Sequence, residues 1–476
     1  MQGYGIFILL YVIAMLVIGI YASKKIKTMD DFALAGRQLT TPVLVGTLLA
    51  SLVGGATVVG WTGSFYSLGV DWWMTFAGTV AGLCLAAFFM AERSRRLKQY
   101  TLPDLLDLRY DGKTRTIGSL MIIVGDIALT CVQIMSVGGI LTAFLGIPRV
   151  IGLSLGTVAF IAIAFYGGML GVALTDALQA LVIIGGLIIG AGFAFNYAGG
   201  WSGITSALPN DYFQLFSHIK LFDGIGNALA ILGTIAVWQS IIFSRVFAAK
   251  NPKTAKKSVI LLIPSFGLAA LCVFFIGMSA RAMFGGGIAP ANVFATVTTE
   301  VLHPAVATLL LAVVVGALLT TTNSILLSIS INITRDFYQK FFVPEADDGR
   351  LVKVARASVL LIGILAYLMA LLMPDIVSAI VFTYTMYSAA LLIPLYGGYM
   401  WKRANSTGGF WGILCGATVA VVWHFAGKPL GLHPMLPAAL ASALALIIGS
   451  LITEKPSSEQ LKVFDIMNNK LADEEA

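Results

Sequence analysis

The chain has 476 residues, of which 58% are hydrophobic and only 11% carry a charge. A soluble globular protein has about a quarter of its residues charged, so this composition excludes one. The net charge of +7 does not indicate a nucleic-acid partner, because the lysines and arginines stand in short clusters between apolar runs, as they do in membrane proteins.

Apolar stretches of about 20 residues, long enough to cross a bilayer, follow one another along the chain. The first stretch has no basic residue before it and is followed by Lys24, Lys25 and Lys27. This order is the reverse of a signal peptide and predicts a retained helix with its N-terminus outside. In chain order we predict about thirteen spans, at about 3–22, 42–65, 70–92, 116–145, 149–168, 173–197, 224–246, 256–283, 304–333, 354–373, 375–400, 407–425 and 435–453.

The basic residues support this topology. With the N-terminus outside, 26 of the 30 lysines and arginines fall on the inner side, Arg245 counted among them. The stretches between spans are too short for a soluble core, so we expect one transmembrane domain over 1–453 and an inner polar tail over 454–476. The expected location is the cell (inner or plasma) membrane, with the lipid bilayer and no obligatory protein partner around the chain.

The second predicted span is rich in small and hydroxyl residues, among them Gly54, Gly55 and Thr57. Two interpretations are open. Such a composition is typical of the broken helices that form ion sites near the middle of the membrane in secondary transporters. It is also typical of helices that pack closely through small residues.

Five motifs, in this order, make the chain resemble the sodium:solute symporter family from about Tyr11 to Ile452. They are GWTGSFYSLG at 60–69, TDALQ at 175–179, SRVFAAKNPKTAKKS at 244–258, GALLTTTNSILLSISINITRDFY at 316–338 and SAALLIPLYGGYMWKRANSTGGFWG at 388–412. The resemblance implies sodium-coupled symport of a small organic solute by alternating access. It also implies an all-α, LeuT-like core of five plus five inverted-repeat helices, over about 42–197 and 224–400.

The same resemblance implies one sodium ion between the second and ninth spans. Its expected ligands are the carbonyls of Ala50, Val53 and Ala317 and the hydroxyls of Thr320 and Thr321. Sodium prefers about five oxygen ligands, and neutral oxygens suffice for weak, reversible binding. Positions 317, 320 and 321 share one helical face. The alternative is that both hydroxyls only bond carbonyls of their own helix.

Two acids lie within predicted spans. By resemblance, Asp176 contributes to a second sodium site or to coupling, together with Thr320, Asn323 and Ser324; Asn323 departs from the family's serine there. Asp126 has no counterpart in the resemblance. It is either a coupling acid near the solute path or a carboxyl group bonded to a neighbour such as Gln133 or a hydroxyl.

The resemblance places the solute between the broken second and seventh spans, with contributions from the fourth and eleventh. The candidate residues are Gly54, Thr57, Gln133, Trp238, Gln239 and Tyr384. The residues with which relatives recognise sugars and sialic acid are missing, since Thr57, Phe76 and Leu129 stand at those positions. An amino acid or small carboxylate is the solute class that we expect.

Three other functions are known for chains that span a membrane many times. A membrane-embedded enzyme would need clustered acid, base or nucleophile side chains, whereas the intramembrane acids stand apart in the sequence. A channel or sensor could use the same helices without alternation. A proton-coupled symporter could use Asp126 or Asp176, although the predicted site of hydroxyls and carbonyls needs no titrating group.

Overall fold

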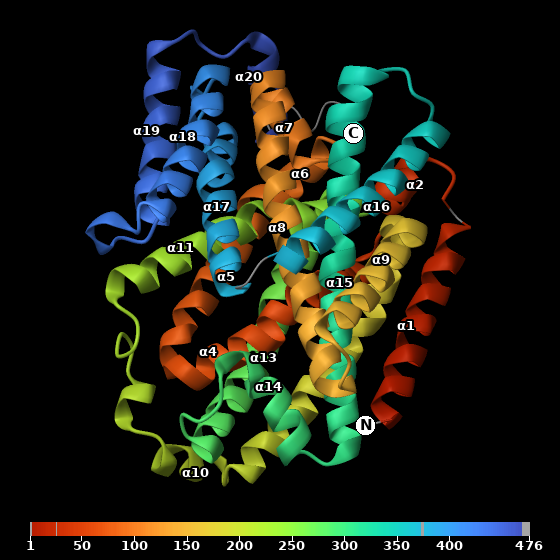
Figure 1. The fold of residues 1–476 in the computed structure, drawn as a ribbon. Helices are drawn as coiled ribbons and strands as arrows, with labels where there is room; N and C mark the ends of the chain where they lie inside the picture. Colours follow the sequence, from red (N-terminus) through yellow and green to blue (C-terminus); the bar gives the residue numbers. More distant parts are fainter. Residues whose placement is uncertain (1, 25, 373–375, 469–476) are drawn as a thin grey trace.

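Helices make up nearly all of the protein, whose computed structural model describes residues 2–24, 26–372 and 376–468 (Figure 1). The longer helices are α1 (Gln2–Ser23), α8 (Gly112–Leu145), α9 (Arg149–Tyr197), α11 (Leu221–Val237), α13 (Pro252–Phe284), α15 (Pro304–Asn332), α16 (Asp348–Leu372), α17 (Ile376–Met400), α18 (Ser406–Phe425) and α19 (Met435–Ile452). The shorter α-helices are α2 (Met29–Leu34), α3 (Thr41–Leu52), α4 (Trp61–Leu68), α5 (Trp73–Leu85), α6 (Glu92–Arg96), α7 (Leu102–Arg109), α10 (Gly200–Ala207), α12 (Ser244–Ala248), α14 (Val293–Thr296) and α20 (Ser458–Met467).

Several helices continue into π-helical or 3₁₀ turns. The π-helical segments are η2 (Ala56–Gly60), η4 (Ala86–Ala91), η6 (Gln239–Phe243), η8 (Val297–Val301) and η9 (Ile333–Phe342). The 3₁₀ turns are η1 (Ala35–Arg37), η3 (Gly69–Trp72), η5 (Asn210–Phe213), η7 (Pro290–Asn292) and η10 (Pro429–Gly431). Two of these segments, η2 and η6, lie beside the functional site.

The prediction of an all-helical, multi-pass membrane protein is confirmed. Within the described residues, nine helices are long and apolar enough to cross a membrane, and two shorter apolar helices cover Ile13–Ala22 and Thr41–Leu52. Two predicted spans form the single helix α9, which departs from helical geometry at Gly168 (φ 51°). The count of thirteen and the outside N-terminus stay predictions, and residues 373–375 and 469–476 lie outside the described part.

Helix α15 lies at the centre of the bundle and packs on α9, α8, α3 and η6 (Figure 1). All of its residues from Leu310 to Asn332 are buried. A helix that is buried on every side can carry polar groups only where neighbouring elements bond them. The hydroxyl run that begins at Thr320 is therefore in contact with other helices and not with lipid.

Two helices are interrupted where they pass α15. Helix α3 ends at Leu52, and Val53 leaves helical geometry with ψ 55° before η2 and α4 resume the path. Helix α11 ends at Val237, and Trp238 takes ψ 100° before η6 and α12. Each break frees backbone carbonyls from the helical ladder. The breaks lie in the first helix of the predicted repeat 42–197 and of the predicted repeat 224–400.

The described part of the predicted tail forms helix α20. Its start is fixed by a capping box in which Ser457 and Gln460 bond each other's backbone N–H groups. Phe464 and Met467 are buried, and α20 contacts α7, α6 and α17. The tail thus covers the end of the bundle at which the basic loops gather.

Candidate functional site

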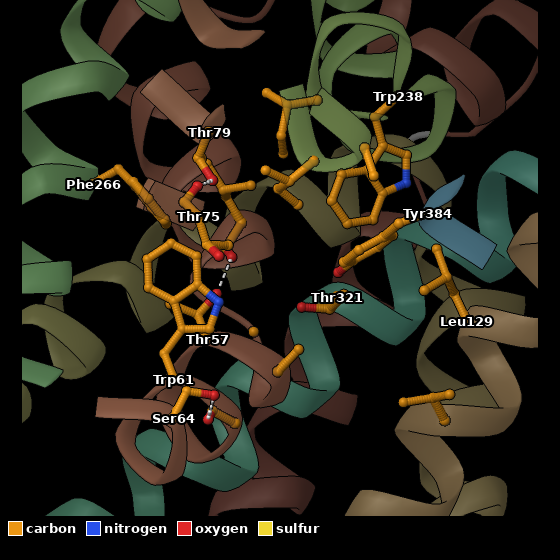
Figure 2. Close-up of a pocket in the computed structure, with 18 of the residues that line it drawn as sticks. Thr57, Trp61, Ser64, Thr75, Thr79, Leu129, Trp238, Phe266, Thr321 and Tyr384 are labelled. Atoms are coloured by element: carbon orange, nitrogen blue, oxygen red, sulfur yellow. Dashed lines mark hydrogen bonds between the residues drawn. The ribbon is translucent and has the colours of Figure 1, made fainter. Parts of the chain in front are cut away.

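A cavity of about 420 Å³ lies beside the break between α3 and α4 (Figure 2). Five of the six predicted solute residues line it, namely Gly54, Thr57, Gln133, Trp238 and Tyr384. Further lining residues come from α4, α5, α8, α11, α13 and α15, and those labelled in the close-up are Trp61, Ser64, Thr75, Thr79, Leu129, Phe266 and Thr321. The fold therefore places five of the six predicted solute residues around one cavity.

Gln239 does not line this cavity. Its side-chain oxygen accepts a hydrogen bond of 2.8 Å from the backbone N–H of Leu102, the first residue of α7. Its own backbone N–H donates to the Tyr387 hydroxyl at 3.0 Å. Gln239 thus ties the break of α11 to α7 and α17, and the structure does not support its prediction as a solute contact.

The cavity wall combines aromatic rings with neutral polar groups. Trp238 and Tyr384 meet edge to face with ring centroids 6.0 Å apart, and Trp61 and Phe266 do so at 5.4 Å. None of the described lining residues is charged. The buried Oε1 of Gln133 and the indole nitrogen of Trp238 have no hydrogen-bond partner among the described residues. Such a wall suits a small solute without net charge whose polar groups would complete these bonds.

The predicted ion site joins the break of α3 to α15. The Thr320 hydroxyl lies 2.7 Å from the Ala50 carbonyl and 3.0 Å from the Ala317 carbonyl. The Thr321 hydroxyl lies 2.9 Å from the Ser51 carbonyl and 3.0 Å from the same Ala317 carbonyl. Both hydroxyls therefore reach across to α3 as well as to their own helix.

These five oxygens, two hydroxyls and three carbonyls, have fewer hydrogen-bond donors than acceptors. Each hydroxyl has one proton and can satisfy one carbonyl at a time, whereas three carbonyls surround the pair. A small cation would serve all five oxygens at once, since neutral oxygens of this kind are the ligands that sodium takes. The residues thus fit the predicted ion.

The cluster contains one carbonyl that the sequence did not indicate, that of Ser51, and the Val53 carbonyl as an ion ligand stays a prediction. Val53 lies at the break itself, where its N–H bonds the Leu49 carbonyl at 2.8 Å, and the carbonyl that meets Thr321 belongs to Ser51. The sequence could not indicate which backbone carbonyl meets Thr321, because every residue offers the same backbone oxygen.

Asp176 is fully buried and paired with Arg245, which is also fully buried. Asp176 Oδ2 accepts hydrogen bonds from the Thr47 hydroxyl at 2.7 Å and the Ser51 hydroxyl at 3.1 Å, and Arg245 lies 3.0 Å away. Arg245 also donates to the Ser51 and Ser324 hydroxyls.

Two expectations are corrected here. The sequence places Arg245 in an inner loop, but the residue lies inside the bundle because it belongs to α12, the short helix that continues from the π-helical turn after the break of α11. The sequence also predicts that Asp176 stands apart from other charged groups, whereas the structure pairs it with Arg245. Of the partners predicted for Asp176, Ser324 does lie in this cluster, with its hydroxyl 3.0 Å from that of Ser51. Within the described residues, the Asn323 Oδ1 has no hydrogen-bond partner, so the part of Asn323 in this cluster stays a prediction.

Asp126 is buried beside η6, the π-helical turn that follows the break of α11, and does not line the cavity. Its Oδ2 accepts a hydrogen bond from the Ser240 hydroxyl, and its Oδ1 has no partner in the part of the chain that the structure describes. The sequence offered Gln133 or a hydroxyl as the neighbour that bonds Asp126, and the structure shows a bond to a hydroxyl. Gln133 is not its partner.

A network of charged side chains joins α7, α8 and η9. Arg115 bridges Asp104 at 2.8 Å, Asp107 at 2.9 Å and Asp336 at 2.7 Å. Burial acts to raise the pKa of Asp107, but hydrogen bonds from Lys340 and Arg115 outweigh it and lower that pKa. The cavity extends from the break of α3 along α4 towards Leu68.

Gly54 offers a test of the ion site that leaves the threonines in place. A β-carbon at Gly54 would overlap the Thr321 Oγ1, while its backbone does not have a positive φ. Gly54→Ala is therefore expected to displace that hydroxyl and raise the sodium concentration for half-maximal uptake by about tenfold. Gly60→Ala is the matched control, because Gly60 lines the same cavity and its β-carbon would meet nothing within 4 Å. Equal sodium dependence in both variants would contradict the site.

Known proteins resemble this chain over most of its length. The osmoregulated proline transporter OpuE of Bacillus subtilis (strain 168) is 27% identical over 97% of both chains. The high-affinity proline transporter PutP of the same strain is 26% identical over 93% of this chain and 97% of its own. A sodium/proline symporter of Staphylococcus aureus is 27% identical over 98% of this chain and 96% of its own.

Solved structures share the fold. A sodium-coupled sialic acid symporter in a substrate-bound, outward-open state superposes with a TM-score of 0.83 at 20% identity, over 95% of this chain and 98% of its own. The transporter Mhp1 superposes with a TM-score of 0.58 at 12% identity, over 91% of this chain and 98% of its own. At these identities the likeness supports the LeuT-like fold and not a substrate.

The model of the sodium:solute symporter family matches residues 32–416. That match covers most of the chain, including both broken helices and the whole of α15. The protein is therefore a transporter and not an enzyme, it uses sodium as its coupling ion, and it belongs to the sodium:solute symporter family.

Proposed function

We propose that the protein carries L-proline, or an amino acid of similar size, into the cell across the plasma membrane together with sodium. The observation that carries this proposal is the position of Thr321, which lines the solute cavity and belongs to the five-oxygen cluster. The uncharged wall suits a zwitterion, and relatives over the full length are named as proline transporters.

The shared position of Thr321 gives a physical reason for coupling. The cavity offers no basic side chain to a carboxylate, and a sodium ion at the cluster would supply that positive charge. The ion would bind more tightly with the solute present, and the solute more tightly with the ion, because such coupling is reciprocal. The ammonium group could rest against the faces of Trp238 and Tyr384.

The position of Arg245 supports a single sodium ion. Its guanidinium already donates to Asp176, Ser51 and Ser324, so the side chains that would hold a second sodium carry a fixed cation instead. A second bound cation would add repulsion within the same buried group. We therefore propose one sodium ion per transported solute.

Proton coupling on the same fold is the second candidate. It is favoured by one observation, the buried Oδ1 of Asp126 that lacks a partner. A protonated carboxyl could be accommodated there, whereas the five-oxygen cluster has no titratable group. The experiment below separates the two candidates, because only one of them requires sodium.

Thermal melting of the purified protein tests the proposed function. L-Proline at one hundred times its dissociation constant should stabilise the protein by about 2.7 kcal/mol in sodium, and hardly at all in matched potassium. A panel of other amino acids and small carboxylates, run in both salts, defines the solute class. A proline-induced shift of equal size in sodium and potassium would contradict sodium coupling, and a sodium-specific shift with another solute would replace proline.

A further inference from the structure

A second cavity, of about 630 Å³, lies between the first half of α9 and α16. Its lining includes the exposed side chains of Val158, Leu360 and Ile364, so it is open to the outside of the bundle. It is separate from the solute cavity, with which it shares no lining residue. In a membrane, a groove of this kind faces the acyl chains of lipids.

The two helices fix the length of the groove. At one end the Ser154 and Tyr367 hydroxyls bond each other at 2.9 Å, and at the other the Arg356 guanidinium lies over the Phe165 ring, 5.7 Å from its centroid. The 12 residues from Ser154 to Phe165 make 11 steps along the helix, a rise of about 16 Å. That length is close to one leaflet of a hydrocarbon core about 30 Å thick.

The Phe165 end of the groove carries unpaired positive charge. Arg356 has no ion pair or hydrogen bond recorded within the described residues, and its Nε is buried without a partner. Lys353, one turn earlier on α16, is exposed, while the acids Asp347 and Asp348 lie about two turns from Arg356. A buried guanidinium nitrogen without a partner is costly, so an anion at this end would be favourable.

We propose that the groove binds one anionic phospholipid, with an acyl chain along α9 and α16 and the phosphate at Arg356 and Lys353. The apolar groove would accept any acyl chain, and the charge at its end selects an anionic headgroup. This end also lies towards the start of α16, where the chain comes from the basic inner segment around Arg335 and Lys340. The inference does not depend on the proposed solute.

Lipid binding to the purified full-length protein tests the proposal. Native mass spectrometry in detergent would compare phosphatidylglycerol with phosphatidylcholine of the same acyl chains. The wild type is expected to prefer phosphatidylglycerol, and Arg356→Gln is expected to reduce that preference about fivefold. Arg350→Gln is the matched control, because Arg350 lies on the same helix but is exposed and bonded to the Tyr338 hydroxyl.

A second variant tests the groove itself. Ala162 lines it, so Ala162→Trp should reduce the binding of both lipids, whereas Leu365→Trp, at an exposed position of α16 outside the lining, should not. An unchanged phosphatidylglycerol preference in Arg356→Gln would overturn the proposal. So would a loss of dimers in Ala162→Trp with unchanged lipid binding, since the groove would then be an interface between two copies.

Discussion

Replacing Thr321 with alanine is expected to raise the sodium concentration for half-maximal uptake by about tenfold or more. The hydroxyl lies within hydrogen-bonding distance of carbonyls on both α3 and α15, so its loss removes one ion ligand and one link between the two helices. A hydrogen bond to a charged group contributes about 1.5–3 kcal/mol, which corresponds to a factor of about 10 to 150. Thr320→Ala is expected to behave similarly, because its hydroxyl meets the Ala50 carbonyl at 2.7 Å.

The neighbouring Thr322 provides the control for both variants. It is also buried, but its hydroxyl bonds only the Leu318 carbonyl of its own helix, at 2.7 Å. Thr322→Ala should therefore leave the sodium dependence close to that of the wild type. Uptake in proteoliposomes, measured against sodium concentration at fixed solute, gives all three values. If the half-saturation for sodium were the same in Thr321→Ala, Thr320→Ala and Thr322→Ala, the assignment of the ion site would be wrong.

Arg245→Ala is expected to destabilise the protein by about 3–5 kcal/mol, the second large effect. Both partners of this pair have no exposed side-chain surface, so removing the guanidinium leaves the Asp176 carboxylate buried without a counter-ion. Asp176→Asn alone leaves the opposite charge unpaired. The double variant Asp176→Asn with Arg245→Met removes both charges and should be more stable than either single variant.

Thermal melting in detergent measures these changes, and an exposed pair serves as the comparison. Lys256 lies 3.3 Å from Glu92 and both side chains are partly exposed, so Lys256→Ala should cost no more than about 1 kcal/mol. If the double variant were less stable than both single variants, an unpaired buried charge would not be the main cause of their destabilisation. A melting point of Arg245→Ala equal to that of the wild type would contradict the buried pair.

The sequence was most informative where polar residues interrupt an apolar, membrane-spanning stretch. Thr320 and Thr321 stand in an apolar stretch, and the structure brings both to α3, as predicted. For Gly54 and Gly55 the sequence left a broken helix and close helix packing open, and the structure shows both. Helix α3 ends just before them at Leu52, and at both positions a β-carbon would overlap a side chain of α15.

The second break had no such signal. Val237, Trp238 and Gln239 contain neither glycine nor proline, and the break of α11 is held by contacts from distant segments. The Tyr387 hydroxyl accepts from the Gln239 N–H, and the Gln239 side chain accepts from Leu102. Contacts over about 140 residues of sequence cannot be predicted from local composition.

The burial of the charged residue Arg245 could not be predicted from local sequence either. It stands at the start of the basic run 245–257, and a count of loop charges places it with its neighbours. The fold separates it from them, because Arg245 lies in the short helix α12 that follows the break and points to Asp176. The sequence predicted an isolated acid and a loop cation, and the structure makes them one buried pair.

Sodium-driven accumulation of solute in proteoliposomes tests the central claim most directly. Vesicles with the purified protein would receive labelled L-proline, or the solute identified by melting, under an inward sodium gradient, an inward proton gradient, or neither. We expect concentrative uptake only with the sodium gradient, abolished when sodium is equal on both sides, and a ratio of one sodium ion to one solute. Accumulation driven by the proton gradient without sodium would contradict the account and identify Asp126 as the residue to replace next.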